Sequence, residues 1–452
     1  MLKELHLVNV GPCSELDIRF RQRLNLITGD NGLGKSFLLD VAWWAMTRRW
    51  PVDLNQNLVS GYMARPRSPG AGVIEFVVDG KAKTDLRYRS TFSPQDQAWT
   101  GKAGRPPNPG LVLYAMADGG FAVWDPARNY WRNEGGTDVQ DRPPAYVFSP
   151  RDVWDGLRDP RGTLCNGLVS DWAGWQREGG VAFRQLCAVL RRLSGDGSDV
   201  LTPGPLTRVS LDDVRDIPTL ETEYGGPVPV LYASSGVRRI LALAYLLVWS
   251  WQEHRRAAEL RGEEPTRQVV FLIDEVEAHL HPRWQREVVS ALLEVTRELA
   301  GDADVQQIVA THSPLVMASA EPHFDDELDG WFDVDLVRSD PGTRAEVRLT
   351  KRPFERLGDA SNWLVSEAFD LHSARSREAE ELIDRAEELA DDQQATAADA
   401  DDITERLHRV LGDTDPFWPR WRMAGAHRGW WDPPRGAVSR RPAAESAGGG
   451  DR

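Results

Sequence analysis

Apolar and polar positions alternate at the start of the chain, and the apolar runs then become continuous. Residues 2–10 and 14–20 show the alternation typical of strands with one buried face. Residues 23–28 form a short apolar run that predicts a buried strand, whereas residues 37–46 carry the longer run of a helix. The pattern therefore predicts a strand and a helix joined by a glycine-rich turn.

The turn Gly29-Asp-Asn-Gly-Leu-Gly-Lys-Ser36 fits the phosphate-binding pattern G-x-x-x-x-G-K-[ST] without a mismatch. Its glycines let backbone amides wrap around phosphates, and the helix N-terminus adds a positive dipole end. Lys35 is expected to reach the terminal phosphates, and Ser36 to bind Mg²⁺. The alternative, a glycine-rich turn with a chance Lys-Ser pair, is weakened by the strand before it and the helix after it. The predicted nucleotide-binding residues are Gly29, Asp30, Asn31, Gly32, Leu33, Gly34, Lys35, Ser36 and Phe37, with ATP and Mg²⁺ as the expected cofactors.

The pattern changes beyond the first helix. From about 51 to 144, short β-like runs are separated by Pro/Gly-rich turns, which predicts an antiparallel insertion. Residues 150–195 carry a helical apolar stripe, and strand–helix alternation resumes over about 228–350. Two acidic helices are predicted next, at about 375–393 and 400–412.

Composition places the chain among soluble globular proteins. The 452 residues are 41% apolar and 27% charged, which allows two or three domains. Cys13, Cys165 and Cys187 lie too far apart to suggest a disulfide framework or a zinc cluster, which favours a reducing cytosol. The first residues lack signal-peptide order, and the longest apolar run, 240–251, is too short to span a bilayer. A cytoplasmic protein without membrane contact is expected, and its net charge of −15 argues against non-specific wrapping of nucleic acid.

Two later strands supply the expected second half of a nucleotide site. Residues 269–275 form an apolar run that ends in Asp274 and Glu275. Asp274 is expected to hold Mg²⁺ directly or through water, and Glu275 to polarise the attacking water. Residues 307–312 end in His312, which is expected to lie beside the γ-phosphate as a sensor or hydrogen-bonding partner. A solvated turn is the alternative for the two acids, and the phosphate-binding loop in the same chain disfavours it. A structural role is the alternative for His312, and its place after an apolar strand, 38 residues beyond Asp274, disfavours it.

A second anion site is predicted where a long apolar helix begins. Ser234, Ser235 and Gly236 precede that helix, and hydroxyls at a helix N-terminus attract anions. In a head-to-tail dimer this site would cap the γ-phosphate held by the loop of the other chain. A simple helix cap is the alternative.

These motifs, in this order, resemble the ABC-type ATPase heads of RecF, the SMC proteins and the OLD-like ATPases. The similarity is strongest to the OLD-like group, because Asp-Glu-x-Glu-Ala-His-Leu-His-Pro follows the strand, with Val276 as x. It covers residues 1–48 and about 228–350 well, and 51–225 poorly. The resemblance implies an α/β P-loop NTPase fold and two ATP molecules sandwiched between two chains, with Glu277 to Pro282 at the interface.

The resemblance divides the chain into five predicted parts. They are an N-terminal head part with the phosphate-binding loop (1–50), a β-rich and then helical insertion (51–225), a C-terminal head part with the signature, acidic strand and histidine (226–350), a helical extension (351–412) and a partly disordered Arg/Trp-rich tail (413–452).

One departure concerns the glutamine loop that ABC heads carry after an early strand. The strand matched to it, 145–149, continues Pro-Arg-Asp-Val-Trp, and Gln140 lies too early. Either the Mg²⁺ and water contact is made differently, or the alignment with the insertion is wrong.

The remaining segments bear on what the head controls. Residues 51–225 contain many Pro and Gly and no sustained heptads, which excludes a long coiled coil. Asp399-Ala-Asp401 lies in a polar helix rather than after an apolar strand, so no nuclease is expected in this chain. Residues 361–371 and 376–383 also resemble the segment after the head in PtuA-type ATPases of anti-phage systems. That resemblance implies a separately encoded effector, commonly an HNH nuclease.

Two C-terminal segments have an unusual composition. Residues 377–402 hold eleven acidic and two basic residues, which is typical of a solvated helix face or of a partner-binding surface. Residues 417–441 hold six arginines and four tryptophans. This mixture suits docking of a protein partner, stacking on nucleobases, or packing against the head.

The sequence therefore predicts an ABC-type ATPase, an ATP phosphohydrolase that acts as an ATP-dependent homodimer switch or higher oligomer. Its expected role is the sensor or motor subunit that controls a partner nuclease in anti-phage defence, with DNA or RNA as further partners left open. One alternative is a RecF-like DNA-repair ATPase acting directly on DNA, whose hydrolysis DNA would stimulate with a steep salt dependence. The other is a non-hydrolysing scaffold with structural ATP.

Overall fold

The fold comprises two compact units, Met1–Asp370 and Leu371–Arg452. The computed structural model describes residues 1–79, 85–101, 108–129, 133–134, 137–138, 145–160, 162–195, 200–222, 225–338, 345–369 and 371–431. Within this described part of the chain, no helix is both long enough and apolar enough to cross a bilayer.

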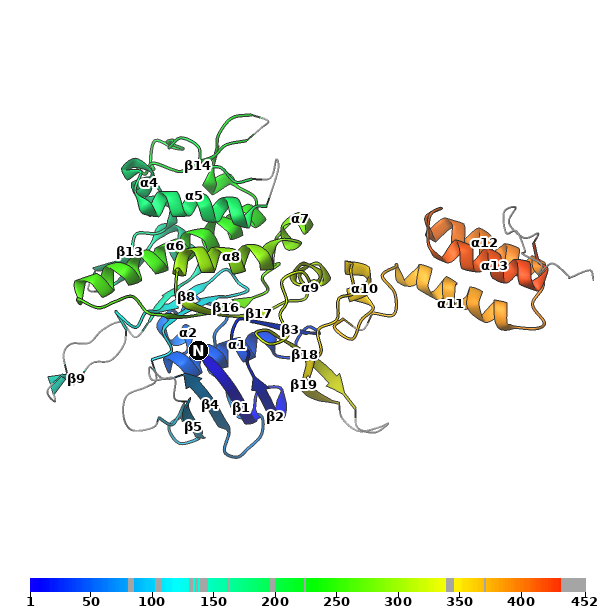
Figure 1. The fold of residues 1–452 in the computed structure, drawn as a ribbon, viewed down its shortest axis with the longest axis horizontal. Coiled ribbons are helices and arrows are strands. Elements are labelled where there is room, and N and C mark those ends of the chain that lie inside the picture. Colours follow the sequence, from blue (N-terminus) through cyan, green and yellow to red (C-terminus); the bar gives the residue numbers. More distant parts are fainter. Residues whose placement is uncertain are drawn as a thin grey trace, which may run out of the picture. The chain divides into compact units, whose positions relative to one another are not determined.

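A mixed sheet forms the centre of the first unit (Figure 1). Among the described residues its strand order is β11-β8-β7-β16-β17-β3-β18-β19, and the five strands from β7 to β18 are parallel. The parallel strands are β7 (Leu111–Ala115), β16 (Gln268–Asp274), β17 (Asp304–Ala310), β3 (Leu24–Gly29) and β18 (Gly330–Val337). β3 and β7 are buried along their whole length, as expected for strands covered on both faces. The carboxyl ends of these strands meet at one edge of the sheet, which is where ligands bind in such folds.

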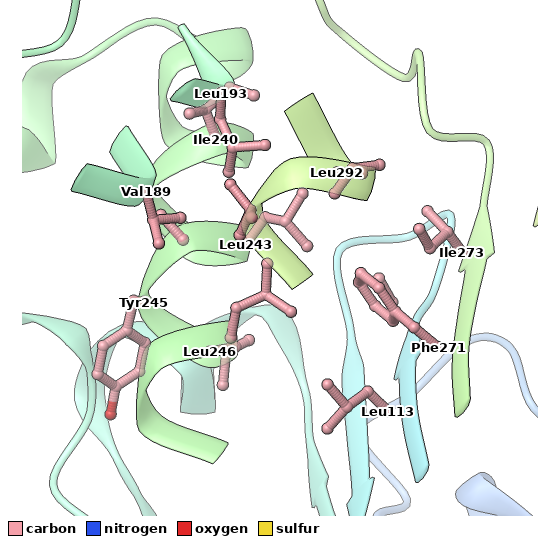
Figure 2. Packing of buried hydrophobic residues seen from close by; sticks show 14 of the residues in the cluster. Leu113, Val189, Leu193, Ile240, Leu243, Tyr245, Leu246, Phe271, Ile273 and Leu292 are labelled. Atoms are coloured by element: carbon pink, nitrogen blue, oxygen red, sulfur yellow. The ribbon is translucent and has the colours of Figure 1, made fainter. Parts of the chain in front are cut away.

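The central sheet separates two hydrophobic cores, each covered by helices on its own face. Val270 and Leu272 of β16 pack on the face covered by α1 (Lys35–Thr47), whereas Phe271 and Ile273 pack on the face covered by α6 (Ser235–Leu260). Figure 2 shows Phe271 and Ile273 directed toward the leucines of this second core. Two further helices, α5 (Val181–Leu193) and α8 (Val288–Ala300), complete that layer. Burying one such side chain contributes about 1.5–3 kcal/mol, so the alternation along β16 holds both layers to the sheet.

A second, antiparallel sheet packs on the α1 side. Its order is β2-β1-β4-β5-β6, and its buried positions on β1 and β2 alternate with more exposed ones. The strands are β1 (Leu2–Val10), β2 (Cys13–Arg19), β4 (Val73–Asp79), β5 (Asp85–Ser93) and β6 (Ala98–Trp99). The β1–β2 turn lies against the phosphate-binding segment, because a Cβ added to Gly34 would lie 2.7 Å from Pro12.

Part of the region expected to be an insertion continues the central sheet. β7 belongs to the parallel core, and β8 (Phe121–Trp124) and β11 (Tyr146–Phe148) extend it in antiparallel pairing. The other elements of this unit are α2 (Pro51–Leu54), β9 (Asn133–Glu134), β10 (Thr137–Asp138), α3 (Pro150–Asp155), β12 (Leu157–Asp159), β13 (Gly162–Cys165), α4 (Leu168–Glu178), β14 (Thr219–Leu220), β15 (Val228–Pro229), η2 (Val230–Tyr232), α7 (Pro282–Gln285), α9 (Pro314–Ala320), β19 (Glu346–Arg352) and α10 (Ala360–Leu364).

The second unit is a small helical bundle with its own core. Its helices are α11 (Arg377–Asp391), α12 (Ala397–Val410) and α13 (Phe417–Arg428). Trp418 and Trp421 of α13 are buried in that core, so their indoles are not a docking surface for a partner or a nucleobase. Asp399 forms a capping box with Thr396, which gives it a structural role. Residues 432–452 of the expected tail lie outside the described residues.

Candidate nucleotide-binding site

The phosphate-binding segment connects the end of β3 to the start of α1. Gly29, Gly32 and Gly34 adopt φ values of +131°, +80° and +101°, which residues with a Cβ rarely reach. A Cβ at Gly29 would also lie 2.0 Å from the carbonyl oxygen of Val334 on β18. The glycines are therefore required by the turn itself, and the turn presents the first amides of α1 to the carboxyl edge of the sheet.

Lys35 lies folded into this turn. Its Nζ donates to the carbonyl oxygens of Gly29, at 2.6 Å, and Asp30, at 2.8 Å. The side chain is buried, and this burial lowers the pKa of Lys35 to about 8 against the opposing attraction of Asp274. A buried ammonium held by carbonyl groups is stabilised further by an anion, so Lys35 is placed to bind a phosphate.

Asp274 ends β16 beside Ser36, the second residue of α1. Burial raises the pKa of Asp274 to about 6, and a hydrogen bond from Ser36 opposes the rise. Oδ1 of Asp274 is buried and has no hydrogen-bond partner among the described residues. A buried carboxylate oxygen without a partner, next to a hydroxyl, is the hard oxygen set that Mg²⁺ uses together with substrate phosphates. Ser36 and Asp274 therefore fit Mg²⁺.

Glu275 and His312 lie beside the same loop. Glu275 has φ +48°, a conformation that costs a residue with a side chain about 1–3 kcal/mol and that clusters at functional sites. Burial and the charge of Lys35 lower the pKa of His312, while Glu275 opposes this change. The imidazole also hydrogen-bonds the backbone of Gly29. A neutral His312 therefore faces the phosphate-binding loop at pH 7.

The Ser-Ser-Gly residues lie apart from this group. Ser234 caps α6, because its Oγ accepts the backbone N–H of Val237 at 3.4 Å. Ser234 and Ser235 are exposed, and among the described residues neither shares a hydrogen bond with the phosphate-binding loop. Gly236 instead backs onto the carbonyl oxygen of His279, 2.4 Å from the position of an added Cβ. The structure thus brings together Lys35, Ser36, Asp274, Glu275 and His312, and leaves the two serines on the surface.

Three polar residues around the site were not predicted from the sequence. Arg239 of α6 donates through Nη2 to the carbonyl oxygens of Met116, at 2.8 Å, and Asp274, at 3.4 Å. Tyr114 of β7 donates its hydroxyl to Asp40 of α1 at 2.9 Å, and burial raises the pKa of Asp40 to about 7. The only signal in the sequence is that Asp40 interrupts an apolar helix. These bonds fix α1 and α6 to the ends of β7 and β16.

The glutamine-loop alignment with residues 145–149 is wrong. A loop that reaches Mg²⁺ must follow a strand next to β16, and the parallel neighbour of β16 is β7. β11, which contains most of 145–149, is separated from β16 by β8 and β7. Residues Met116–Gly119 follow β7, and Asp118 accepts hydrogen bonds there from Ser60 Oγ at 2.9 Å and Gly120 N at 2.8 Å. Gln140 lies outside the described residues.

A family model matches the part of the chain that contains these residues. Residues 24–318, more than half of the chain, match the family described as "AAA domain, putative AbiEii toxin, Type IV TA system". Septu protein PtuA of Bacillus mycoides (strain KBAB4) is 28% identical over 153 residues. The matched region is 34% of this chain and 18% of PtuA, so the chain spans less than a fifth of that relative. The family match and this similarity confirm the predicted resemblance to PtuA-type ATPases.

Solved SMC heads are similar at low scores. The SMC head domain from Thermotoga maritima has a TM-score of 0.37 and 14% identity, over 78% of this chain and 99% of that one. An Smc head domain with an extended coiled coil, bound to the C-terminal domain of ScpA and derived from Pyrococcus furiosus, has a TM-score of 0.38 and 11% identity, over 77% and 96%. The α/β P-loop fold predicted from the sequence is confirmed by the family match and by the strand order around the loop.

Proposed function

Because the chain belongs to the family described as "AAA domain, putative AbiEii toxin, Type IV TA system", we propose that it hydrolyses ATP with Mg²⁺ as an ATP-dependent dimer switch. The strongest supporting observation is that a buried cation and a buried anion, Lys35 and Asp274, lie close together at the carboxyl edge of the sheet. Lys35 is a buried ammonium held by carbonyl oxygens, and Asp274 is a buried carboxylate with an oxygen that lacks a partner among the described residues. Mg²⁺ and a triphosphate supply the opposite charge that each requires.

Each side chain of the site has a separate role in the proposed phosphoryl transfer. Ser36 and Asp274 would hold Mg²⁺, which when bound neutralises charge on the terminal phosphates. Lys35 binds the same phosphates, and Glu275 orients the attacking water and accepts its proton. The lowered pKa keeps His312 neutral, with a single ring N–H. In the proposed ATP complex this N–H would turn from the Gly29 backbone to the γ-phosphate.

The exposed serines support a site shared by two chains. Ser234 and Ser235 stand on the surface at the N-terminus of a long helix, where a phosphate oxygen is stabilised by the helix dipole. In the proposed head-to-tail homodimer, they cap the γ-phosphate held by the loop of the other chain. Binding of ATP therefore closes the dimer, and hydrolysis opens it.

We further propose that this switch controls a separately encoded effector, a nuclease, in anti-phage defence. The similarity to Septu protein PtuA over 153 residues supports this assignment. The net charge of −15 disfavours direct, non-specific action on DNA. The effector is therefore expected to be a protein partner that responds to the open or closed state.

Size measurements with and without ATP test the switch. Glu275→Gln keeps the shape of the side chain but removes the base, so we expect slow hydrolysis and a stable ATP-bound dimer in light scattering after gel filtration. Lys35→Ala, the control, should stay monomeric with ATP because it no longer binds the phosphates. A Glu275→Gln protein that hydrolyses ATP at the parental rate contradicts the assigned base, and one that stays monomeric with ATP contradicts the switch.

Hydrolysis assays with and without duplex DNA separate the proposal from direct action on DNA. We expect the same rate in both at moderate salt. Strong stimulation by DNA that disappears as salt rises would instead indicate a DNA-repair ATPase. Tight ATP binding without turnover would indicate a scaffold.

A further inference from the structure

Glu277 is a half-buried carboxylate for which the proposed hydrolysis has no use. It lies three residues beyond the end of β16, and its two oxygens bond the loop that follows β17. Oε2 accepts the Thr311 hydroxyl at 2.8 Å, and Oε1 accepts the backbone N–H of His312. Burial raises the pKa of Glu277, and the two bonds oppose this rise. One carboxylate therefore holds two consecutive residues of the His312 loop.

A second side chain holds the next residue of the same loop. Ser313 donates its hydroxyl to Oε1 of Gln285 at 2.7 Å, and Nε2 of Gln285 donates to the carbonyl oxygen of Leu280 at 2.9 Å. The three consecutive residues 311–313 are thus tied to the segment 277–285, through two side-chain hydroxyls and the backbone N–H of His312. The imidazole takes no part in these ties and remains directed at the phosphate-binding loop, where it bonds Gly29.

The other side of the same segment touches the start of α6. His279 has φ +63°, and its carbonyl oxygen lies against Gly236 so closely that no Cβ fits between them. The segment 277–285 therefore stands between the His312 loop and the helix turn that carries Ser234 and Ser235.

We propose that Glu277 is a positioning residue for His312. Its carboxylate fixes the position of the backbone at His312. The same segment contacts the start of α6 through His279 and Gly236, so it links the His312 loop to the end of α6 that carries the two serines. In the proposed dimer, His312 contacts the γ-phosphate bound by its own chain, whereas Ser234 and Ser235 cap the γ-phosphate bound by the other chain. The segment 277–285 would therefore link the two nucleotide sites. The proposal rests on the proposed function, since His312 must act on a bound nucleotide. Charge-assisted hydrogen bonds are strong enough to fix such a loop, and a misplacement of about 1 Å costs about 10²-fold in rate.

Two substitutions separate the hydrogen bond from the charge. Glu277→Gln removes the charge but keeps an oxygen that accepts the His312 N–H, whereas Glu277→Ala removes both. We expect Glu277→Ala to lower kcat about 10²-fold with KM for ATP changed less than about twofold, and Glu277→Gln to retain kcat within about fivefold. In a His312→Ala background, Glu277→Ala should cost nothing further, because the residue it positions is already absent. Equal kcat values for the two Glu277 variants, or losses that multiply with that of His312→Ala, would overturn the proposal.

The pKa of His312 tests the positioning role of Glu277 without a measurement of hydrolysis. The ring signal of His312 is assigned by NMR as the one lost in His312→Ala, and its pKa is compared in the two Glu277 variants, which carry the same charge. We expect a higher pKa, nearer the ordinary value of about 6.5, in Glu277→Ala because the released loop meets solvent. Equal pKa values refute the positioning role, whether or not the parental protein hydrolyses ATP. Failure of hydrolysis in the parental protein, with the pKa difference present, refutes the proposed function alone. Thermal unfolding of each variant verifies that it folds.

Discussion

Gly236, at the start of α6, lies so close to the carbonyl oxygen of His279 that a single substitution tests whether Ser234 and Ser235 belong to the nucleotide site. Gly236→Ala adds one methyl group whose carbon would lie 2.4 Å from that oxygen. Even close carbon–oxygen contacts in proteins are about 3.3 Å, so the helix turn and the segment at His279 must separate by about 0.9 Å. Gly236 lies in a helix without a positive φ, so the perturbation is steric and does not strain the backbone.

The size of the effect follows from this displacement. Ser234 and Ser235 sit on the displaced turn, and a misplacement of about 1 Å at a catalytic group costs about 10²-fold in rate. We therefore expect kcat for ATP to fall about 10²-fold in Gly236→Ala. ATP affinity of the monomer, measured at low protein concentration, should remain at the parental value, because among the described residues no hydrogen bond joins Gly236 to the loop Gly29–Ser36. The overpacking should cost about 1–3 kcal/mol in the free energy of unfolding.

The assay measures steady-state hydrolysis and binding of a fluorescent ATP analogue. Gly174→Ala is the matched control, because Gly174 lies in α4 and an added Cβ has no neighbour within 4 Å. The control should hydrolyse ATP at the parental rate and gain up to about 1 kcal/mol in stability. Parental hydrolysis by Gly236→Ala would refute the role of this helix turn.

Mixing two inactive variants tests whether the site is shared between chains. In a mixed dimer of Gly236→Ala and Lys35→Ala, one site combines the intact loop of the first chain with the intact serines of the second. We expect the mixture to recover up to about a quarter of the parental rate, the value reached when half of the chains are in mixed dimers with one complete site each. A mixture as inactive as its components would refute the head-to-tail arrangement.

Two further predictions concern stability. Burial raises the pKa of Asp274 to about 6, against about 3.9 in an unfolded chain, so its ionisation costs stability above about pH 6 and nothing below about pH 4. In denaturant titrations, Asp274→Asn should therefore raise the free energy of unfolding by about 2–3 kcal/mol at pH 8 and leave it unchanged at pH 4. The same substitution should abolish Mg²⁺-dependent hydrolysis. An unchanged free energy of unfolding at pH 8 would contradict a buried, ionised Asp274. Asp329 is buried and accepts from Arg23 at 2.6 Å and from the backbone N–H of Leu24 at 3.0 Å, so Asp329→Ala should cost about 3–5 kcal/mol in the same titrations. The exposed Asp326→Ala is its control, and equal losses in both would refute the ion-pair argument.

Features made from contiguous residues were predictable from the sequence. The strand expected at 23–28 is β3, and the helix expected at 37–46 lies within α1. Both follow from local rules, because a short apolar run with a glycine turn leaves few conformations open and the phosphates bind to adjacent amides. The apolar run expected at 269–275 is β16, which ends at Asp274, with Glu275 next in the chain.

Features that depend on the order of strands in the sheet were not predictable. The glutamine-loop strand was misplaced because β7, β8 and β11 are all short apolar runs, and only their pairing shows which one lies beside β16. The tryptophans of α13 were open to three interpretations because composition does not show which face of a helix is buried. The fold of the second unit decides that Trp418 and Trp421 are core residues.

By itself, the sequence determined the motif of a phosphate-binding loop and predicted which acids and histidine belong beside it, because each motif is local and its chemistry requires those residue types. Only the tertiary structure decided how these motifs are held together. Glu277 accepts hydrogen bonds from Thr311 and His312, which lie 34 and 35 positions later in the chain. Gly236 contacts His279, and the rest of α6 and all of β16 lie between these two residues in the sequence. Such contacts exist because parallel strands bring their carboxyl ends to one edge, and the choice of neighbours is made by packing over the whole sheet.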